Sequence, residues 1–380
     1  MMIWKKLLLA LTTLSTAVIA AAQEESSAFN MTRGVTEVSR DAYDMHMLLF
    51  WVCVAIGVGV FGVMIWSLIR HRRSRGAKAA KFSENTVVEV VWTAIPVLIL
   101  VAVAVPATAV LLKTNSPSPE PDVVVDVHGS QWKWEYVYPD EDISFFSNLS
   151  SSSRDASQLN AEKSPADAPN YLVDVDNPLV VPAGQDVRLR ITSDDVIHSW
   201  WVPQLGFKRD AVPGQFNNAD IRIDEPGTYR GQCAELCGSG HAYMPVVVEA
   251  VMPEAYDEWL AQKKQAAAEE AKKASGPWNR EVAMAQGKKI YDSACASCHQ
   301  ANGKGVEGTF PALEGGEITT GPVEGHLNIV IHGSEKNPVM QAYGDQLSDR
   351  EIAAVVTYER NAWSNDTGDL VTPEAVEAAR

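Results

Sequence analysis

Two long apolar runs dominate the first third of the chain. Residues 45–69 are almost uncharged, and residues 87–112 are apolar apart from Glu89. About 20 apolar residues are enough to cross the hydrocarbon core of a bilayer, so the pattern predicts a transmembrane hairpin over residues 23–114. The connector at 70–81 is rich in Arg and Lys, which places it on the cytoplasmic side and the rest of the chain outside.

A shorter apolar run at residues 7–19 follows Lys5 and Lys6 and precedes three alanines. This order of a basic, an apolar and a small-residue region is typical of a secretory signal peptide. We therefore assign residues 1–22 to a signal peptide and exclude them from the fold. The alternative is an uncleaved short membrane anchor.

Short stretches of strand character, separated by Pro, Gly, Asp and Asn, follow the second apolar run. They occur at 123–128, 131–138, 171–175, 186–192, 219–223, 227–232 and 245–250. Many short strands at this spacing predict a β-sandwich or barrel, here over residues 115–252. Trp134, Tyr136 and Tyr138 alternate with other residues and are expected to face the core. The serine-rich stretch 147–169 is expected to be a polar surface loop.

The pattern becomes helical after residue 252. Residues 253–274 predict a helix that passes into an Ala/Glu/Lys spacer, so we assign 253–279 to a helical linker. Helical patterning resumes near Glu281 and ends with a capping box at 348–351 ahead of a helix at 352–363. Residues 280–380 are therefore expected to form an all-α domain.

The charge and the cysteine count narrow the function classes. The chain has 32 basic and 48 acidic residues, a formal charge of −16, which argues against nucleic acid as a partner and favours a basic protein or a cation. Five cysteines are too few for a disulfide scaffold. Cys53 falls in the first apolar run as a small apolar residue, and the other four fall in two motifs.

The first motif places Cys233, Cys237, His241 and Met244 within twelve positions after an expected strand. Soft sulfur with imidazole suits copper, zinc or iron–sulfur, and the thioether favours copper. His198, at an earlier strand end, would supply a second imidazole. Two bridging thiolates, with one His and one thioether or carbonyl per metal, would make a two-copper centre. The alternative is a structural disulfide between the two cysteines.

The second motif is Cys295-Ala-Ser-Cys298-His299, the attachment sequence of a c-type heme. Two thioether bonds would fix the porphyrin and His299 would ligate the iron. A thioredoxin-like redox pair would need a βαβ context that the pattern lacks. Met340 is the expected sixth ligand, because His/Met ligation favours reduced iron. The competing sixth ligands are His326 and His332.

The copper motif, together with residues 129–134 and 176–182, resembles subunit II of heme–copper cytochrome c oxidases over about residues 30–260. Residues 280–363 resemble a small class I cytochrome c. The resemblance implies a multi-domain membrane protein with a two-helix transmembrane hairpin, an all-β cupredoxin-like Greek-key domain and an all-α cytochrome c domain. The whole chain therefore resembles the oxidase type in which a cytochrome c is fused to subunit II.

The resemblance also implies residue roles. The ligands of the binuclear CuA centre would be the side chains of His198, Cys233, Cys237, His241 and Met244 and the backbone carbonyl of Glu235. The Glu235 side chain would help hold magnesium at the interface with subunit I. Trp132 would be the exposed tryptophan through which electrons enter from cytochrome c.

Four further positions match or depart from the family pattern, namely Glu89, Asp194, Asp195 and Gln215. Glu89 matches a carboxylate at the mouth of a proton pathway, whereas the alternative is a carboxylate that reaches the lipid headgroups. Asp194 and Asp195 resemble part of an acidic docking surface for the basic donor, although acidic loop residues are more often merely solvated. Gln215 stands where the family usually has Arg, which puts the contact of that Arg near subunit I in doubt.

The expected function is electron transfer from cytochrome c through CuA to heme a and CuB of subunit I, where oxygen is reduced to water with proton translocation. Partners would be oxidase subunits I and III, cytochrome c and the lipid bilayer. The expected location is the bacterial inner membrane, with the copper and heme domains on the periplasmic side. Alternatives are a component of a nitric oxide or nitrous oxide reductase and a membrane-tethered electron carrier or copper-delivery protein.

Overall fold

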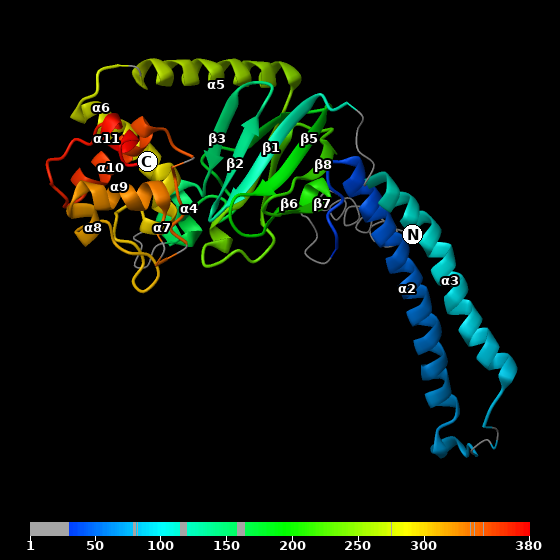
Figure 1. Cartoon of the computed structure of the whole chain (residues 1–380). Coiled ribbons are helices and arrows are strands. Elements are labelled where there is room, and N and C mark those ends of the chain that lie inside the picture. The colour runs from blue at the N-terminus through cyan, green and yellow to red at the C-terminus, as the bar shows by residue number, and fades with distance from the viewer. Residues whose placement is uncertain are drawn as a thin grey trace, which may run out of the picture. The chain divides into compact units, whose positions relative to one another are not determined.

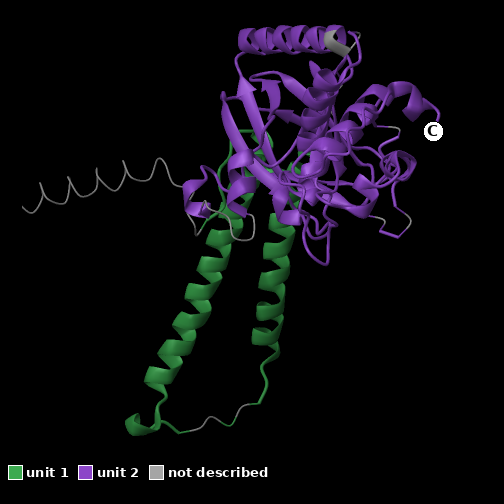
Figure 2. Ribbon diagram, turned by 90° about the vertical axis from the view of Figure 1, so that its left-hand side faces the viewer, with its two compact units in different colours: residues 1–117, 203–207 green, residues 118–202, 208–380 purple. Residues whose placement is uncertain are grey.

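The computed structural model describes residues 30–78, 81, 83–114, 120–157, 164–274, 276–334, 336–337, 339–344 and 346–380. The expected signal peptide at 1–22 lies outside these residues. The chain divides into two compact units, shown in Figure 2. Residues 1–117 with 203–207 form the first unit, and residues 118–202 with 208–380 form the second.

The first unit contains both predicted membrane helices, α2 (Glu37–Arg70) and α3 (Thr86–Thr114). Each is long and apolar enough to span a bilayer, which confirms the prediction. Both helices extend beyond the apolar runs of the sequence. In α2, the polar residues 37–44 form the first turns of the helix. Lys113 of α3 also lies 2.6 Å from Glu37 and 2.7 Å from Asp41 of α2, so polar contacts join the two helices beyond their apolar segments.

The second unit begins with two five-stranded sheets (Figure 1). The first sheet has the order β3-β2-β1-β5-β8 and the second has β4-β10-β9-β6-β7. Their bounds are β1 Val123–Ser130, β2 Lys133–Tyr138, β3 Ile143–Ser147, β4 Leu179–Pro182, β5 Asp186–Ser193, β6 His198–Val202, β7 Phe207–Ala211, β8 Asn217–Arg222, β9 Gly227–Cys233 and β10 Pro245–Val251. The two sheets confirm the predicted all-β domain.

The β-domain core follows the predicted alternation. Trp134, Tyr136 and Tyr138 of β2 are fully or almost fully buried. Two local predictions are wrong. Residues 171–175 form no strand apart from an isolated bridge between Val175 and Leu149. The stretch 147–169 holds the short helix α4 (Ser151–Ser157), which forms because Ser153 and Ala156 bury one of its faces.

The predicted linker helix is α5 (Pro253–Ala274). Its first half packs on the β-domain, where the Trp259 ring lies 5.3 Å from Tyr138 and 6.2 Å from Phe145. Lys264 forms a 2.5 Å ion pair with Glu141. Past this point α5 is polar and solvent-exposed up to residue 272, as expected of a spacer.

The C-terminal region is helical, as predicted. Its helices are α6 Arg280–Ile290, α7 Ala296–His299, α8 Glu317–Thr320, α9 Val323–His332, α10 Asp349–Asn361 and α11 Pro373–Glu377, with a π-helical turn at Tyr291–Cys295 between α6 and α7. The predicted capping box is present, since Ser348 caps α10 and Glu351 bonds back to its backbone. Buried residues of α9, α10 and the π turn form one apolar core.

Helices α6 and α10 cross at Gly287. A Cβ built there would lie 2.1 Å from the carbonyl oxygen of Ala354 and 2.6 Å from the Cβ of Tyr358. Gly287→Val is therefore expected to push the helices apart and destabilise the C-terminal domain by about 1–3 kcal/mol. Thermal unfolding followed in the full-length chain would measure this loss. Gly325→Ala in α9 is the control, because nothing lies within 4 Å of its added Cβ; equal melting of both variants would contradict the packing argument.

Candidate metal centre and cofactor cavity

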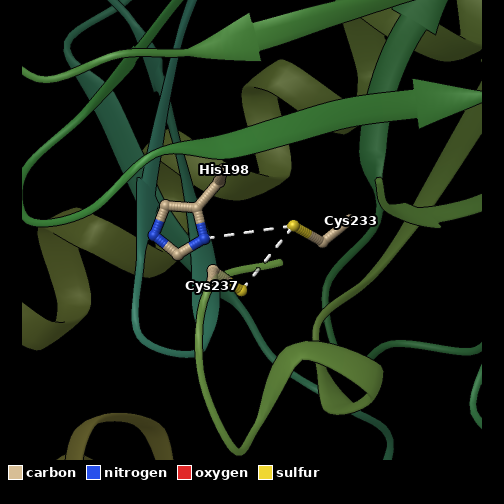
Figure 3. A group of neighbouring side chains, drawn as sticks. All are labelled: His198, Cys233 and Cys237. Carbon is tan, nitrogen blue, oxygen red and sulfur yellow. Dashed lines mark hydrogen bonds between the residues drawn. The ribbon is translucent and has the colours of Figure 1, made fainter. Parts of the chain in front are cut away.

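The first site lies where β6 and β9 meet the loop that leads into β10. His198 begins β6, Cys233 ends β9, and Trp200 and Cys233 are paired across these strands. The sulfur of Cys233 lies 3.8 Å from that of Cys237 and 4.0 Å from Nδ1 of His198. Figure 3 shows these three side chains pointing toward one another.

The other expected donors surround the same sulfur pair. The sulfur of Cys237 lies 3.5 Å from Nδ1 of His241 and 3.5 Å from the sulfur of Met244. The Cys233 sulfur lies 3.4 Å from the backbone carbonyl of Glu235. Each sulfur thus has its own imidazole and one further donor. Two thiolates between two such sets fit a pair of soft metal ions, and the two cysteines are not bonded to each other.

The two thiols titrate as a pair. A hydrogen bond from Cys237 lowers the pKa of Cys233, whereas the neighbouring Cys233 raises the pKa of Cys237. Because metal ions bind thiolate rather than thiol, loading the site would release any proton that the two sulfurs still hold.

A residue that the sequence analysis assigned elsewhere orients the first imidazole. Nε2 of His198 lies 2.8 Å from Asp195, which leaves Nδ1 facing the Cys233 sulfur. Burial disfavours the charged form of His198, but its hydrogen bonds to Asp195 and Cys233 outweigh this effect and raise its pKa. Carboxylates commonly fix ligand imidazoles in this way. The sequence signal that could have identified this contact is the position of Asp195, three residues before His198.

The two proposed docking carboxylates are engaged within the chain. Besides its contact with His198, Asp195 accepts a 2.8 Å hydrogen bond from the backbone amide of Gln131. Asp194 lies 3.0 Å from Nδ1 of His128. The side chain of Asp195 is only 17% exposed, that of Asp194 40%, so Asp195 is far less available to a partner than its loop position suggests.

Trp132 lies against the metal-site loop. Its indole nitrogen donates a 3.1 Å hydrogen bond to the carbonyl of Cys237, and its ring lies 5.7 Å from Phe310 of the helical domain. The family resemblance implied an exposed tryptophan, but Trp132 is 3% exposed. The loop around Gly240 and the ring of Phe310 account for this burial.

The second site is a cavity of about 310 Å³ in the helical domain. The cysteines and histidine of the attachment motif line it, and so does Met340. Much of the remaining lining is apolar, and it includes Leu313, Val330, Leu347 and Val355. Cofactor sites are typically of this kind, apolar and roughly 300–1,000 Å³ in volume. The sequence motif and the cavity therefore fit a covalently attached heme.

A backbone carbonyl orients the imidazole of this cavity. Nδ1 of His299 donates a 2.8 Å hydrogen bond to the carbonyl of Pro311, so Nε2 is the nitrogen left to ligate iron. Of the competing sixth ligands, His326 lines the cavity, but its Nε2 lies 2.8 Å from Glu359. His332 is not part of the described lining, and its Nε2 lies 3.4 Å from the carbonyl of Ala379.

Of the two expected partner-facing residues, Glu89 is half-buried and Glu235 is exposed. The carboxylate of Glu89 lies in the first turn of α3 and accepts a 3.2 Å hydrogen bond from the Asn85 amide. The Glu235 side chain is exposed beside Leu236, which is 79% exposed. The role of Glu89 at a proton pathway and that of Glu235 at a magnesium site are taken up below as proposals. Gln215 is exposed as well.

The fold and the two sites define a membrane-anchored electron-transfer protein. The family of the cytochrome c oxidase subunit II periplasmic domain matches residues 123–251, and that of its transmembrane domain matches residues 24–110. The family of subunit III of cbb3-type cytochrome c oxidase matches residues 282–358. The chain belongs to the cytochrome c oxidase subunit II family and carries a C-terminal cytochrome c domain.

Individual relatives agree with this family. A probable cytochrome c oxidase subunit 2 of Rickettsia bellii (strain RML369-C) is 39% identical over 232 residues, which cover 61% of this chain and 82% of the relative. Cytochrome c oxidase subunit 2 of Arabidopsis thaliana is 35% identical, with 60% and 86% covered. The periplasmic domain of subunit II from Bradyrhizobium japonicum is 33% identical, covers 39% of this chain and 96% of its own, and has a TM-score of 0.34. The families imply copper and heme c.

Proposed function

We propose that this subunit takes electrons from cytochrome c, soluble or fused, through a binuclear CuA centre and delivers them to heme a and CuB of subunit I, where oxygen is reduced to water with proton translocation. The observation that carries the proposal is the paired sulfur site in the same chain as the heme-attachment cavity. Cys233 and Cys237 each have their own imidazole neighbour. Two copper ions held there would supply a one-electron acceptor, and heme c would supply a one-electron donor.

Residues of this chain hold the two centres in defined positions. Asp195 and the Pro311 carbonyl fix the ligand imidazoles of the two sites. Trp132 links them, because its indole bonds to the Cys237 backbone while its ring touches Phe310 of the helical domain. We assign Trp132 to the electron path on these contacts.

Docking on subunit I is assigned to the metal-site loop. Leu236 is an exposed apolar side chain at its tip, and Glu235 lies beside it with an exposed carboxylate. An apolar contact flanked by a carboxylate suits a protein interface that also holds magnesium. Glu89 is assigned to the mouth of the proton pathway on the cytoplasmic side.

The assembly follows from the same assignment. We place the subunit in the bacterial inner membrane, with both redox domains on the periplasmic side, in lipid contact and associated with subunits I and III. Purification from membranes in mild detergent, followed by measurement of subunits, metals and oxygen uptake, tests this. Co-purification with a heme-a-bearing subunit that consumes oxygen is expected. Recovery of the chain alone, without such a partner, would contradict the proposal.

Met340 is assigned as the sixth ligand of heme c. A Met340→Ala variant is expected to keep its covalently attached heme but to lose methionine ligation, so that the reduced iron becomes less favoured. Heme staining on a denaturing gel, an optical spectrum and a redox titration would measure this. Met252→Ala is the control, because Met252 is 55% exposed on the β-domain. An unchanged heme spectrum in Met340→Ala would instead favour His326.

A further inference from the structure

Lys133 is buried although its side chain lies on the outer face of its sheet. Strand alternation directs Trp134, Tyr136 and Tyr138 of β2 into the β-domain core, so Lys133 points to the outer face. A lysine there would normally be solvated, yet Lys133 is 1% exposed. Its burial therefore requires a cover on the outer face, and Tyr343 of the helical domain contributes to it.

The ammonium of Lys133 has no hydrogen-bond acceptor among the described residues. It lies 4.4 Å from the ring centre of Phe146 in β3 and 5.2 Å from that of Tyr343. Aromatic faces at these distances attract a cation and offer little to a neutral amine. Burial lowers the pKa of Lys133, and the charges of Cys295 and Cys298, and then those of Glu135 and Asp195, oppose this effect without outweighing it.

This cation lies at the edge of the heme-attachment cavity. Tyr343 lines the cavity, and so does Gln131, two residues before Lys133. A buried ammonium without an acceptor among the described residues thus lies against the ring of Tyr343, a residue of the cavity lining.

We propose that Lys133 acts on heme c through its charge, and that its ammonium stabilises the reduced state of the heme. The inference rests on the proposed function, because it requires heme at Cys295 and Cys298. One electron from the external donor lowers the net charge of the heme by one, with no bond made or broken and no proton moved. A fixed cation in a site shielded from water favours that state. The electron then leaves toward the copper site.

The test is a redox titration of heme c in the purified complex carrying Lys133→Met, which removes the charge and keeps an unbranched side chain one atom shorter. At a fixed ambient potential, the ratio of reduced to oxidised heme is expected to fall about tenfold, equivalent to about 59 mV for one electron. Lys133→Arg keeps the charge and is expected to stay within about twofold of the parent. The potential of the copper centre should change less than that of heme c.

Lys263→Met is the matched control. Lys263 of α5 also lies over aromatic rings, 4.4 Å from that of Phe145 and 5.8 Å from that of Trp259, and its pKa is likewise lowered by burial. Neither of these two rings belongs to the described cavity lining, whereas Tyr343 does. An unchanged heme potential in Lys133→Met at full heme content would overturn the inference, as would an equal shift in Lys263→Met. Absence of covalent heme from the parent protein would instead refute the proposed function.

Discussion

A Cys233→Ser variant is expected to lose its copper and keep its heme c. Both expected metal ions share the two sulfurs, which lie 3.8 Å apart, so removal of one sulfur leaves a single thiolate between two imidazoles. Serine keeps the size of the side chain, but its hydroxyl is a poor ligand for soft copper. Because loss of an outer-shell partner alone costs 10–100-fold in metal affinity, loss of a bridging ligand should cost more than about 100-fold.

The ratio of copper to heme in the purified subunit measures this loss. The parent chain is expected to hold two copper ions per heme c, and the variant fewer than one. Cys53→Ser is the control, because Cys53 lies exposed in α2 and is not a member of the described donor cluster. Two copper ions per heme in the Cys233→Ser variant would show that the ligand assignment is wrong.

A double Cys295→Ala, Cys298→Ala variant is expected to lose covalent heme completely. Both cysteines line the cavity of about 310 Å³, and an unfilled cavity of this size destabilises a domain by several kcal/mol on the usual volume relation, about 24 cal/mol per Å³. The C-terminal domain should therefore melt at a lower temperature and become sensitive to protease, while the β-domain keeps its copper.

Heme staining on a denaturing gel and thermal unfolding report the two parts of this expectation. Cys53→Ala controls for loss of a cysteine as such. Persistent heme staining of the double variant would mean that the porphyrin is attached elsewhere or held without these thioethers. Either result would contradict the assignment of the second motif.

The fold class could be predicted from the sequence because each region has its own pattern of hydrophobic residues. The membrane runs, the alternation of Trp134, Tyr136 and Tyr138 and the capping box at Ser348 are local signals, and the structure confirms them. Strands such as β6, His198–Val202, carry no alternation because nearly every residue is buried. The pattern therefore missed β6, and also the short strands β3, β4 and β7.

The site was only partly readable, for a different reason. Donor residues within one motif, such as Cys233 and Cys237, are adjacent in sequence, whereas the groups that orient the imidazoles include the backbone carbonyl of Pro311, which has no sequence signature. The burial of Trp132 and Lys133 depends on residues about 180–210 positions away in another domain. No local pattern reports such a contact.

Helix α5 has a kinetic consequence for the choice of electron donor. Its 22 residues form a rod of about 33 Å, anchored at one end by Trp259 and Lys264 on the β-domain. A covalent tether makes the encounter of two domains intramolecular, with an effective concentration on the order of millimolar. A freely diffusing competitor at micromolar concentration would need roughly a thousandfold tighter binding to displace the tethered domain from Trp132.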